Sequence, residues 1–165
     1  MTAWPEGSPR RLLAALDGSA TALRAAEVAV ALAARYGGDL VMVHVLDDDR
    51  VREIAAALGT DESEAHRRLE ENAERVLDAG RELARLQHVP CATRVETGDP
   101  PRVIDRMAVE LGADLIVVGK VGQRGVRSWF VGSTTRRLIE STHIPVLVIP
   151  GASEAAEPPD AGRRG

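Results

Sequence analysis

Apolar positions in this chain follow two alternating patterns, short continuous runs and stripes with helical spacing. A continuous apolar run of about four to eight residues predicts a strand buried on both faces, as in a parallel sheet. Four such runs and one segment of alternating polar and apolar residues predict five strands. They cover residues 12–16, 40–46, 91–97, 114–118 and 144–149.

The segments between the predicted strands carry helical stripes. Asp99 followed by Pro100 is a strong helix start, an N-cap with proline in the first turn, and Gly112 closes that helix. The predicted helices cover residues 19–36, 47–58, about 61–88, 100–111 and 133–141. In the longest of them, the predicted buried stripe consists of Ala65, Leu69, Ala73, Val76, Leu83 and Leu86.

The regular alternation of strands and helices predicts an α/β fold. Right-handed crossovers between parallel strands place helices on both faces of the sheet. We therefore expect an open, Rossmann-like, five-stranded parallel sheet with strand order 3-2-1-4-5. Ligands of such sheets bind outside the carboxyl ends of the strands, where the winding direction reverses. Asp17 follows the first predicted strand and Gly119 the fourth, so one crevice is expected to receive both.

Chain length and composition bound the class of protein. The 165 residues, 44% of them hydrophobic, predict one domain over residues 10–150, with tails at 1–9 and 151–165 that have little to bury. The net charge of −4 and 2% aromatic content argue against nucleic-acid binding. A single cysteine fits a reducing compartment, and no apolar run is long enough for a membrane span. We expect a cytoplasmic protein without membrane or nucleic-acid partners.

The segment after the fourth predicted strand is the most informative for function. A buried strand opens into a glycine-rich loop, which enters a helix through Gly132 and Ser133. A helix amino end presents unpaired N–H groups and a partial positive charge, and glycines let the backbone approach an anion closely. Arg124 and Arg127 lie in the same loop. The segment therefore predicts a phosphate site of a nucleotide-binding protein.

The full spacing, Gly119-x2-Gly122-x9-Gly132-Ser133, resembles the ATP-binding signature of the universal stress protein family, whose fold is adenine nucleotide alpha hydrolase-like. Residues 12–19, 40–45 and 143–149 are similar to other stretches of that family, and the likeness covers about residues 10–150. Lys120 departs from the family pattern, which more often has serine or threonine there, and its role stays open.

The resemblance implies roles for individual residues. Asp17 would face the nucleotide near its ribose and a Mg²⁺ ion bound with it, and Val45 would meet the adenine. The implied contacts to ribose and phosphates come from Gly119, Gly122, Gly132, Ser133 and the adjacent Thr134, with Arg124 as a further candidate. The family usually forms homodimers, often through the last strand, here residues 146–149. An unknown protein partner would read the nucleotide state.

Structural readings compete with the functional ones. Asp17 is as easily the cap of the first helix, and Gly132-Ser133 is an ordinary helix start if considered alone. Arg124 and Arg127 are more often solvated than ligating, since exposed arginines need no partner. Trp129 and Phe130 favour a packing plug over a partner surface.

Three other features favour structure over chemistry. The acidic run at residues 47–49 favours a capped helix start over a metal site, because adjacent side chains converge poorly on one ion. His44, inside an apolar strand, is expected to be a satisfied core histidine. Cys91, with only Arg94 as a basic neighbour in sequence, is expected to behave as a small hydrophobe.

The leading hypothesis for function is therefore an ATP-binding universal stress protein that acts as a nucleotide-dependent stress-response regulator. A slow ATP hydrolase or nucleotidyl enzyme using the same crevice is the alternative. A third reading is a family member that binds no nucleotide and serves only for interaction, against which the complete glycine signature argues. No GxxxxGK[ST] motif is present, which disfavours a motor-type ATPase.

Overall fold

The computed structural model describes residues 7–120 and 131–151. Five parallel strands form one sheet in the order β3-β2-β1-β4-β5, which confirms the predicted fold class and strand order. The strands are β1 (Arg11–Ala15), β2 (Asp39–Leu46), β3 (Cys91–Thr97), β4 (Leu115–Gly119) and β5 (Val146–Ile149). The helices are α1 (Ala20–Tyr36), α2 (Asp48–Leu58), α3 (Glu62–Leu86), α4 (Pro100–Leu111) and α5 (Ser133–Ser141).

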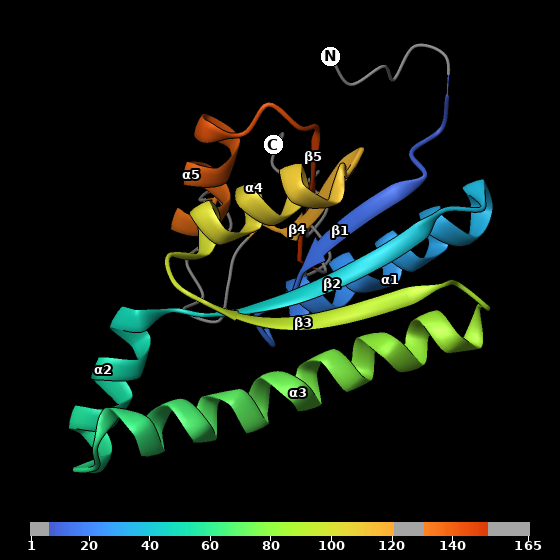
Figure 1. Ribbon diagram of the computed structural model, residues 1–165. Coiled ribbons are helices and arrows are strands. Elements are labelled where there is room, and N and C mark those ends of the chain that lie inside the picture. The colour runs from blue at the N-terminus through green and yellow to red at the C-terminus, as the bar shows by residue number, and fades with distance from the viewer. Residues whose placement is uncertain (1–6, 121–130, 152–165) are drawn as a thin grey trace, which may run out of the picture.

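Helices cover both faces of the sheet, as Figure 1 shows. Alternate residues of each strand point to opposite faces, so the sheet divides the core into two clusters. One cluster packs under α1 and α3 and includes Leu12, Met42 and Leu77. The other packs under α4 and α5 and includes Ile104 and Leu138. The central strands are buried on both sides, which explains their continuous apolar sequence.

The α2–α3 hairpin extends beyond the sheet as an arm (Figure 1). It has a small core of its own, formed by Val51, Ala55 and Ala65. The predicted stripe of α3 is wrong at Leu86, which is 62% exposed. Leu77, Gly80 and Ala84 are buried instead, because the second half of α3 lies on the sheet and turns these residues toward it. In the described residues, no helix has both the length and the apolar character needed to cross a membrane.

Candidate functional site

The site predicted from the sequence lies where β1 ends between β2 and β4. In the register of the sheet, Ala15 at the end of β1 lies level with Val43 of β2 and with Val118 of β4. Two residues beyond these three positions lie Asp17, Val45 and Lys120. The fold thus brings Asp17, Val45 and the start of the glycine loop to one edge. This edge is the switch point, since the chain winds from β1 toward β2 and later continues at β4 on the other side.

Asp17 forms the turn that leads into α1. The Ser19 N–H donates a hydrogen bond to Asp17 Oδ1 over 2.9 Å, and Gly18 between them has φ of 83°, a conformation that favours glycine. The N-cap of α1 is Ser19, whose Oγ accepts from the Ala22 N–H at 3.1 Å. The interpretation of Asp17 as the helix cap is therefore wrong. Its side chain is exposed at the edge of the sheet.

Gly119 ends β4 against the first turn of α1. A Cβ added there would lie 2.7 Å from Thr21 Oγ1 and 3.0 Å from the Ala22 nitrogen, both closer than van der Waals contact allows. Glycine is therefore needed to let α1 approach the sheet, whether or not a ligand is present. Contact of this residue with a nucleotide stays a prediction.

The amino end of α5 closes the base of the glycine loop. The Gly132 N–H donates to the Lys120 carbonyl at 2.7 Å, and the Gly132 carbonyl accepts from the Arg136 N–H at 2.9 Å. Thr135, which is buried, donates from Oγ1 to the Gly119 carbonyl at 2.9 Å. These bonds fix the start of α5 directly beside the end of β4.

The N-cap of α5 differs from those of the first three helices. Ser19, Asp47 and Asp61 each place a side-chain oxygen on an N–H of the helix that they begin. Gly132 has no side chain to do so, and its φ of −57° is open to any residue, so the backbone does not require glycine. The first-turn N–H groups, from Ser133 onward, therefore have neither an intrahelical partner nor a capping oxygen from Gly132. This arrangement suits an external anion.

Several predicted residues lie outside the described part of the chain. They are Gly122, Arg124, Arg127, Trp129 and Phe130. The structure therefore brings together Asp17, Val45, Gly119, Gly132, Ser133 and Thr134 from the predicted set.

His44, at the same edge, is a residue for which the sequence prediction is only half right. It is only 8% exposed, and its Nδ1 has no hydrogen-bond partner among the residues that the structure describes. Burial lowers the pKa of His44, and the negative charge of Asp17 opposes this effect. The expected burial is confirmed, whereas the expected hydrogen bonding of the ring is wrong at Nδ1. The sheet register, which sets the end of β2 beside β1, explains the influence of Asp17.

The acidic run at residues 47–49 and Cys91 have structural roles. Asp47 caps α2 by accepting the Asp49 N–H at 3.0 Å, which confirms the predicted capped helix start for the acidic run. Within residues 7–120 and 131–151, no group of three or more His, Cys, Asp or Glu side chains could hold a metal ion. Burial raises the pKa of Cys91, and the positive charge of Arg81 partly opposes it, so the thiol is a small strand hydrophobe as expected.

Two surface hollows lie away from the switch point. One, of about 440 Å³, lies between α2 and α3 and is lined by residues such as Asp48, Arg52 and His66. The other, of about 550 Å³, lies beside α3 and the start of β3 and includes Arg81 and Cys91. Neither hollow is bordered by residues of the predicted site. The predicted site is instead defined by the ends of the strands and the amino end of α5.

The fold and its switch point define a doubly wound α/β protein of the kind that binds ligands at the carboxyl ends of its strands. Comparison with known proteins then identifies the family. The sequence model of the universal stress protein family matches residues 9–150, and the chain belongs to this family.

Individual relatives agree over nearly the whole domain. A universal stress protein of Methanocaldococcus jannaschii is 29% identical over 140 residues, which span 85% of this chain and 81% of the relative. A crystal structure from the same family, from Burkholderia pseudomallei, is 32% identical with a TM-score of 0.70 and covers 89% of this chain and 100% of its own.

Two further structures of universal stress proteins contain nucleotides. One is a complex with cAMP, 21% identical to this chain, with a TM-score of 0.63 and coverage of 87% of this chain and 98% of the other. The other, from Archaeoglobus fulgidus, is a complex with dAMP, 22% identical, with a TM-score of 0.62 and coverage of 86% and 97%. At these identities, the likeness to this chain shows the fold.

Proposed function

We propose that this chain binds ATP at the carboxyl edge of its sheet and acts as a nucleotide-dependent stress-response regulator. The observation that carries the proposal is the amino end of α5, which lacks a capping side chain and is tied to the end of β4 beside Asp17. Oriented N–H groups at the topological switch point are a recurrent way to hold phosphate. Nucleotides bound to two relatives, cAMP and dAMP, support an adenine nucleotide as the ligand class.

The proposed contacts follow the order of the edge. Val45 packs against the cluster under α4 and α5 and offers an apolar surface to adenine. Asp17 lies level with it and would face the ribose. The phosphate tail would then reach the start of α5 at Gly132, Ser133 and Thr134. Gly119, Gly122 and Arg124 are proposed to border the same tail.

A Mg²⁺ ion bound with the nucleotide fits this edge if one carboxylate and the phosphates share it. Mg²⁺ often uses only one or two carboxylates together with phosphate oxygens and water. Asp17 supplies an exposed carboxylate at this edge, and the described residues offer no cluster that would hold a metal by themselves. We therefore propose that Asp17 holds Mg²⁺ only in company with the phosphates, where the ion would neutralise their charge.

The proposal is one of binding, with hydrolysis slow at most. Turnover above about 1 per second, which is the lower end of typical enzymes, would contradict it. Its setting is expected to be the cytoplasm, with a protein partner that reads the nucleotide state.

A homodimer through β5 is a further part of this proposal. β5 is an edge strand, and Val146, Leu147 and Val148 are only partly buried. An unpaired apolar edge is an aggregation hazard, and pairing with a second copy across a two-fold axis removes it. Sedimentation that shows a monomer at micromolar concentration would count against the dimer.

The experiment is to purify the protein without added nucleotide, denature it, and identify released nucleotides by ion-exchange chromatography with mass detection. Stoichiometric ATP is the expected result, and ADP or AMP would indicate turnover. An empty protein that also fails to take up Mg-ATP would overturn the proposal.

Gly132→Val and Gly122→Val are expected to abolish binding while the fold survives. Gly7→Val is the matched control, because a Cβ at Gly7 meets nothing within 4 Å.

A further inference from the structure

An ion pair between α5 and the start of α4 suggests how the proposed site responds to the phosphate tail. Arg137 Nη1 donates to Asp99 Oδ1 at 2.9 Å, and Nη2 donates to Oδ2 at 2.8 Å. This two-pronged geometry joins residues 38 positions apart, whereas most ion pairs among the described residues join positions three or four apart. The pair therefore fixes a guanidinium at a defined place in the fold.

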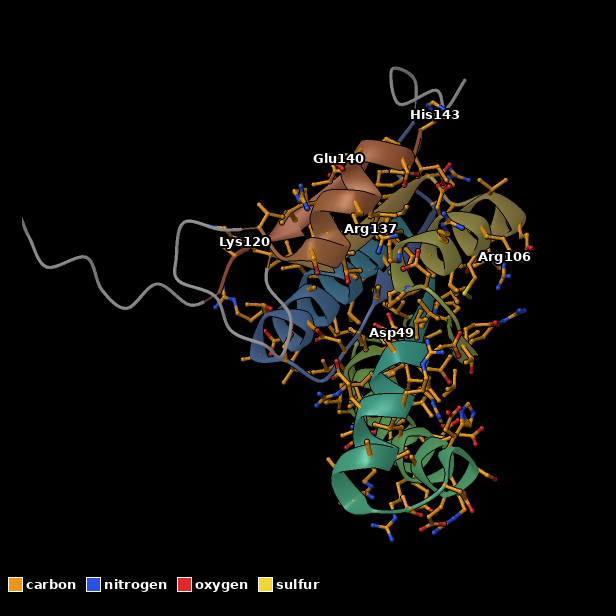
Figure 2. The ribbon with its side chains drawn as sticks, turned by 90° about the vertical axis from the view of Figure 1, so that its left-hand side faces the viewer. Asp49, Arg106, Lys120, Arg137, Glu140 and His143 are labelled. Carbon is orange, nitrogen blue, oxygen red and sulfur yellow. The ribbon has the colours of Figure 1, made fainter. Side chains whose placement is uncertain are left out.

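That place is the carboxyl edge of the sheet, on the α5 side. Asp99 lies two residues after the end of β3, and the Gly98 N–H before it donates to the Leu46 carbonyl at the end of β2. Arg137 lies four residues after Ser133, so both are on one face of α5. Helical side chains lean toward the amino end, which brings the guanidinium back along the first turn. Figure 2 labels Arg137 on α5, Glu140 further along the same helix, and Lys120 where β4 ends.

Asp99 is placed to hold this cation rather than to cap its own helix. It occupies the N-cap position of α4, yet its side chain makes no capping hydrogen bond there. Arg102 Nε also lies 3.5 Å from Asp99 Oδ2. If Arg137 moved away, the carboxylate would keep a cationic neighbour, which lowers the cost of exchange.

We propose that Arg137 is a specificity-determining residue for the phosphate tail, and that Asp99 holds it in reserve until an anionic tail competes for it. This inference rests on the proposed function. Both side chains are more than one third exposed, and ion pairs of this kind are weak in water. A polyphosphate carries more charge than a carboxylate and matches the planar fork of arginine equally well. Exchange of partner is therefore favourable when the tail arrives.

The test is calorimetric titration of nucleotide-free protein with ATP and with adenosine, for wild type, Arg137→Gln, Asp99→Asn and the double variant. Arg137→Gln is expected to weaken ATP binding about tenfold, as loss of a charge-assisted hydrogen bond predicts, and to leave adenosine unchanged. Asp99→Asn is expected to tighten ATP binding, because the cation is released, but to have no effect in the Arg137→Gln background.

The control is Arg136→Gln on the same helix, whose exposed pair with Glu140 spans 3.8 Å. It is expected to change neither affinity. If Asp99→Asn and Arg137→Gln both weaken ATP and adenosine alike, the pair is only a structural tie and the inference is overturned. If wild type binds neither ligand, the proposed function fails first and the inference falls with it. Thermal unfolding of each variant confirms that the fold is intact.

Discussion

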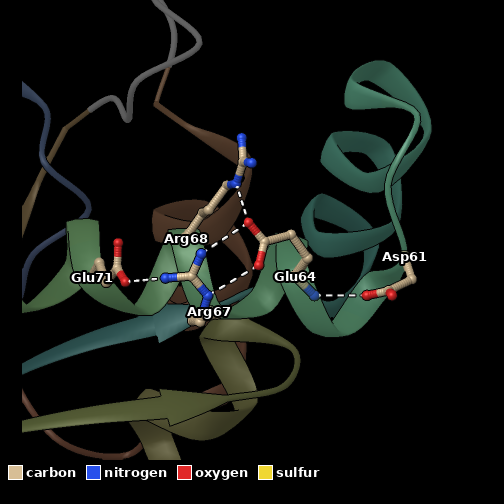
Figure 3. Close-up of polar contacts among 5 residues, drawn as sticks. All are labelled: Asp61, Glu64, Arg67, Arg68 and Glu71. Carbon is tan, nitrogen blue, oxygen red and sulfur yellow. Dashed lines mark hydrogen bonds and ion pairs between the residues drawn. The ribbon is translucent and has the colours of Figure 1, made fainter.

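The carboxyl edge beside β1 and β4 and the α2–α3 arm are stabilised in opposite ways. At the edge, contacts join segments far apart in the chain: the Thr135 hydroxyl bonds the Gly119 carbonyl, and α1 rests directly on Gly119. On the arm, Glu64 accepts hydrogen bonds from Arg67 at 2.9 Å and from Arg68 at 2.6 Å, within one turn of helix, as Figure 3 shows.

The difference shows that charge density is a poor guide to where this protein functions. The arm is rich in ion pairs, but these are local, exposed and satisfied within one helix. Such pairs support helix formation and solubility and contribute little else. At the edge, the amino end of α5 has no capping hydrogen bond from its N-cap residue and lies at the topological switch point. The comparison predicts large effects of substitution at the edge and small ones on the arm.

The largest effect is expected for Gly119→Ala. The new methyl group would collide with Thr21 and Ala22, and overpacking of this kind costs about 2 to 3 kcal/mol of the free energy of unfolding. Gly59→Ala, at the end of α2 on the arm, is the matched control. Its φ is 63° but nothing lies within 4 Å, so only backbone strain of about 1 kcal/mol is expected. Urea unfolding measures both, and equal losses would contradict the close approach of α1 to β4.

The second-largest loss in the free energy of unfolding is expected for Thr135→Val. It removes the hydroxyl donor to the Gly119 carbonyl and leaves a poorly solvated acceptor, which costs about 1 to 2 kcal/mol. Thr135→Ser keeps the hydroxyl and is expected to recover most of the loss. The same urea series distinguishes them, and a Ser variant as unstable as the Val variant would show that the methyl group, not the hydrogen bond, stabilises the start of α5.

A pH dependence is expected from His44. Because burial lowers its pKa in the folded state, the unfolded chain binds the proton more readily. The free energy of unfolding should therefore be highest above pH 6.5, the ordinary pKa of histidine in the unfolded chain. It should fall as the pH drops below that value. The pKa values of Glu64 and Glu82 are lowered, chiefly by hydrogen bonds from Arg68 and Arg85, and affect stability only below about 4.5, so these groups do not account for a fall between 6.5 and 4.5. Urea unfolding of wild type and His44→Gln across this range measures the effect. An equal slope in both would assign it to another group.

The smallest effect is expected for Glu64→Gln on the arm. The variant loses the hydrogen-bonded ion pairs to Arg67 and Arg68, yet both arginines are exposed and return to water at little cost. The midpoint of urea unfolding should stay within experimental error of wild type, more so in high salt. A clear loss of stability would show that the arm is not the merely solvated element described here.

Much of this architecture follows from local sequence signals. The strands could be predicted because the central ones are buried on both faces and therefore read as continuous apolar runs. The starts of α4 and α5 were predicted from Asp99-Pro100 and from Gly132-Ser133, and the structure confirms both. Leu86 was misplaced because helical spacing alone does not show which face of the second half of α3 packs on the sheet.

The parts of the site that depend on tertiary contact could not be predicted. The clash that requires glycine at 119 involves Thr21, and only the packed structure brings the two together. The Asp99–Arg137 pair likewise joins the start of α4 to the middle of α5, and no motif links the two positions. His44 looked like an ordinary core residue, because its missing hydrogen-bond partner is a property of its surroundings rather than of its own strand.

Hydrogen exchange measured by mass spectrometry with and without Mg-ATP tests the central claim most directly. We predict that ATP slows exchange in peptides covering residues 16–22, 43–46 and 131–137, and leaves the arm at residues 48–75 unchanged. Protection confined to the arm, or no protection anywhere at saturating ATP, would contradict the assignment of the nucleotide site to the carboxyl edge of the sheet.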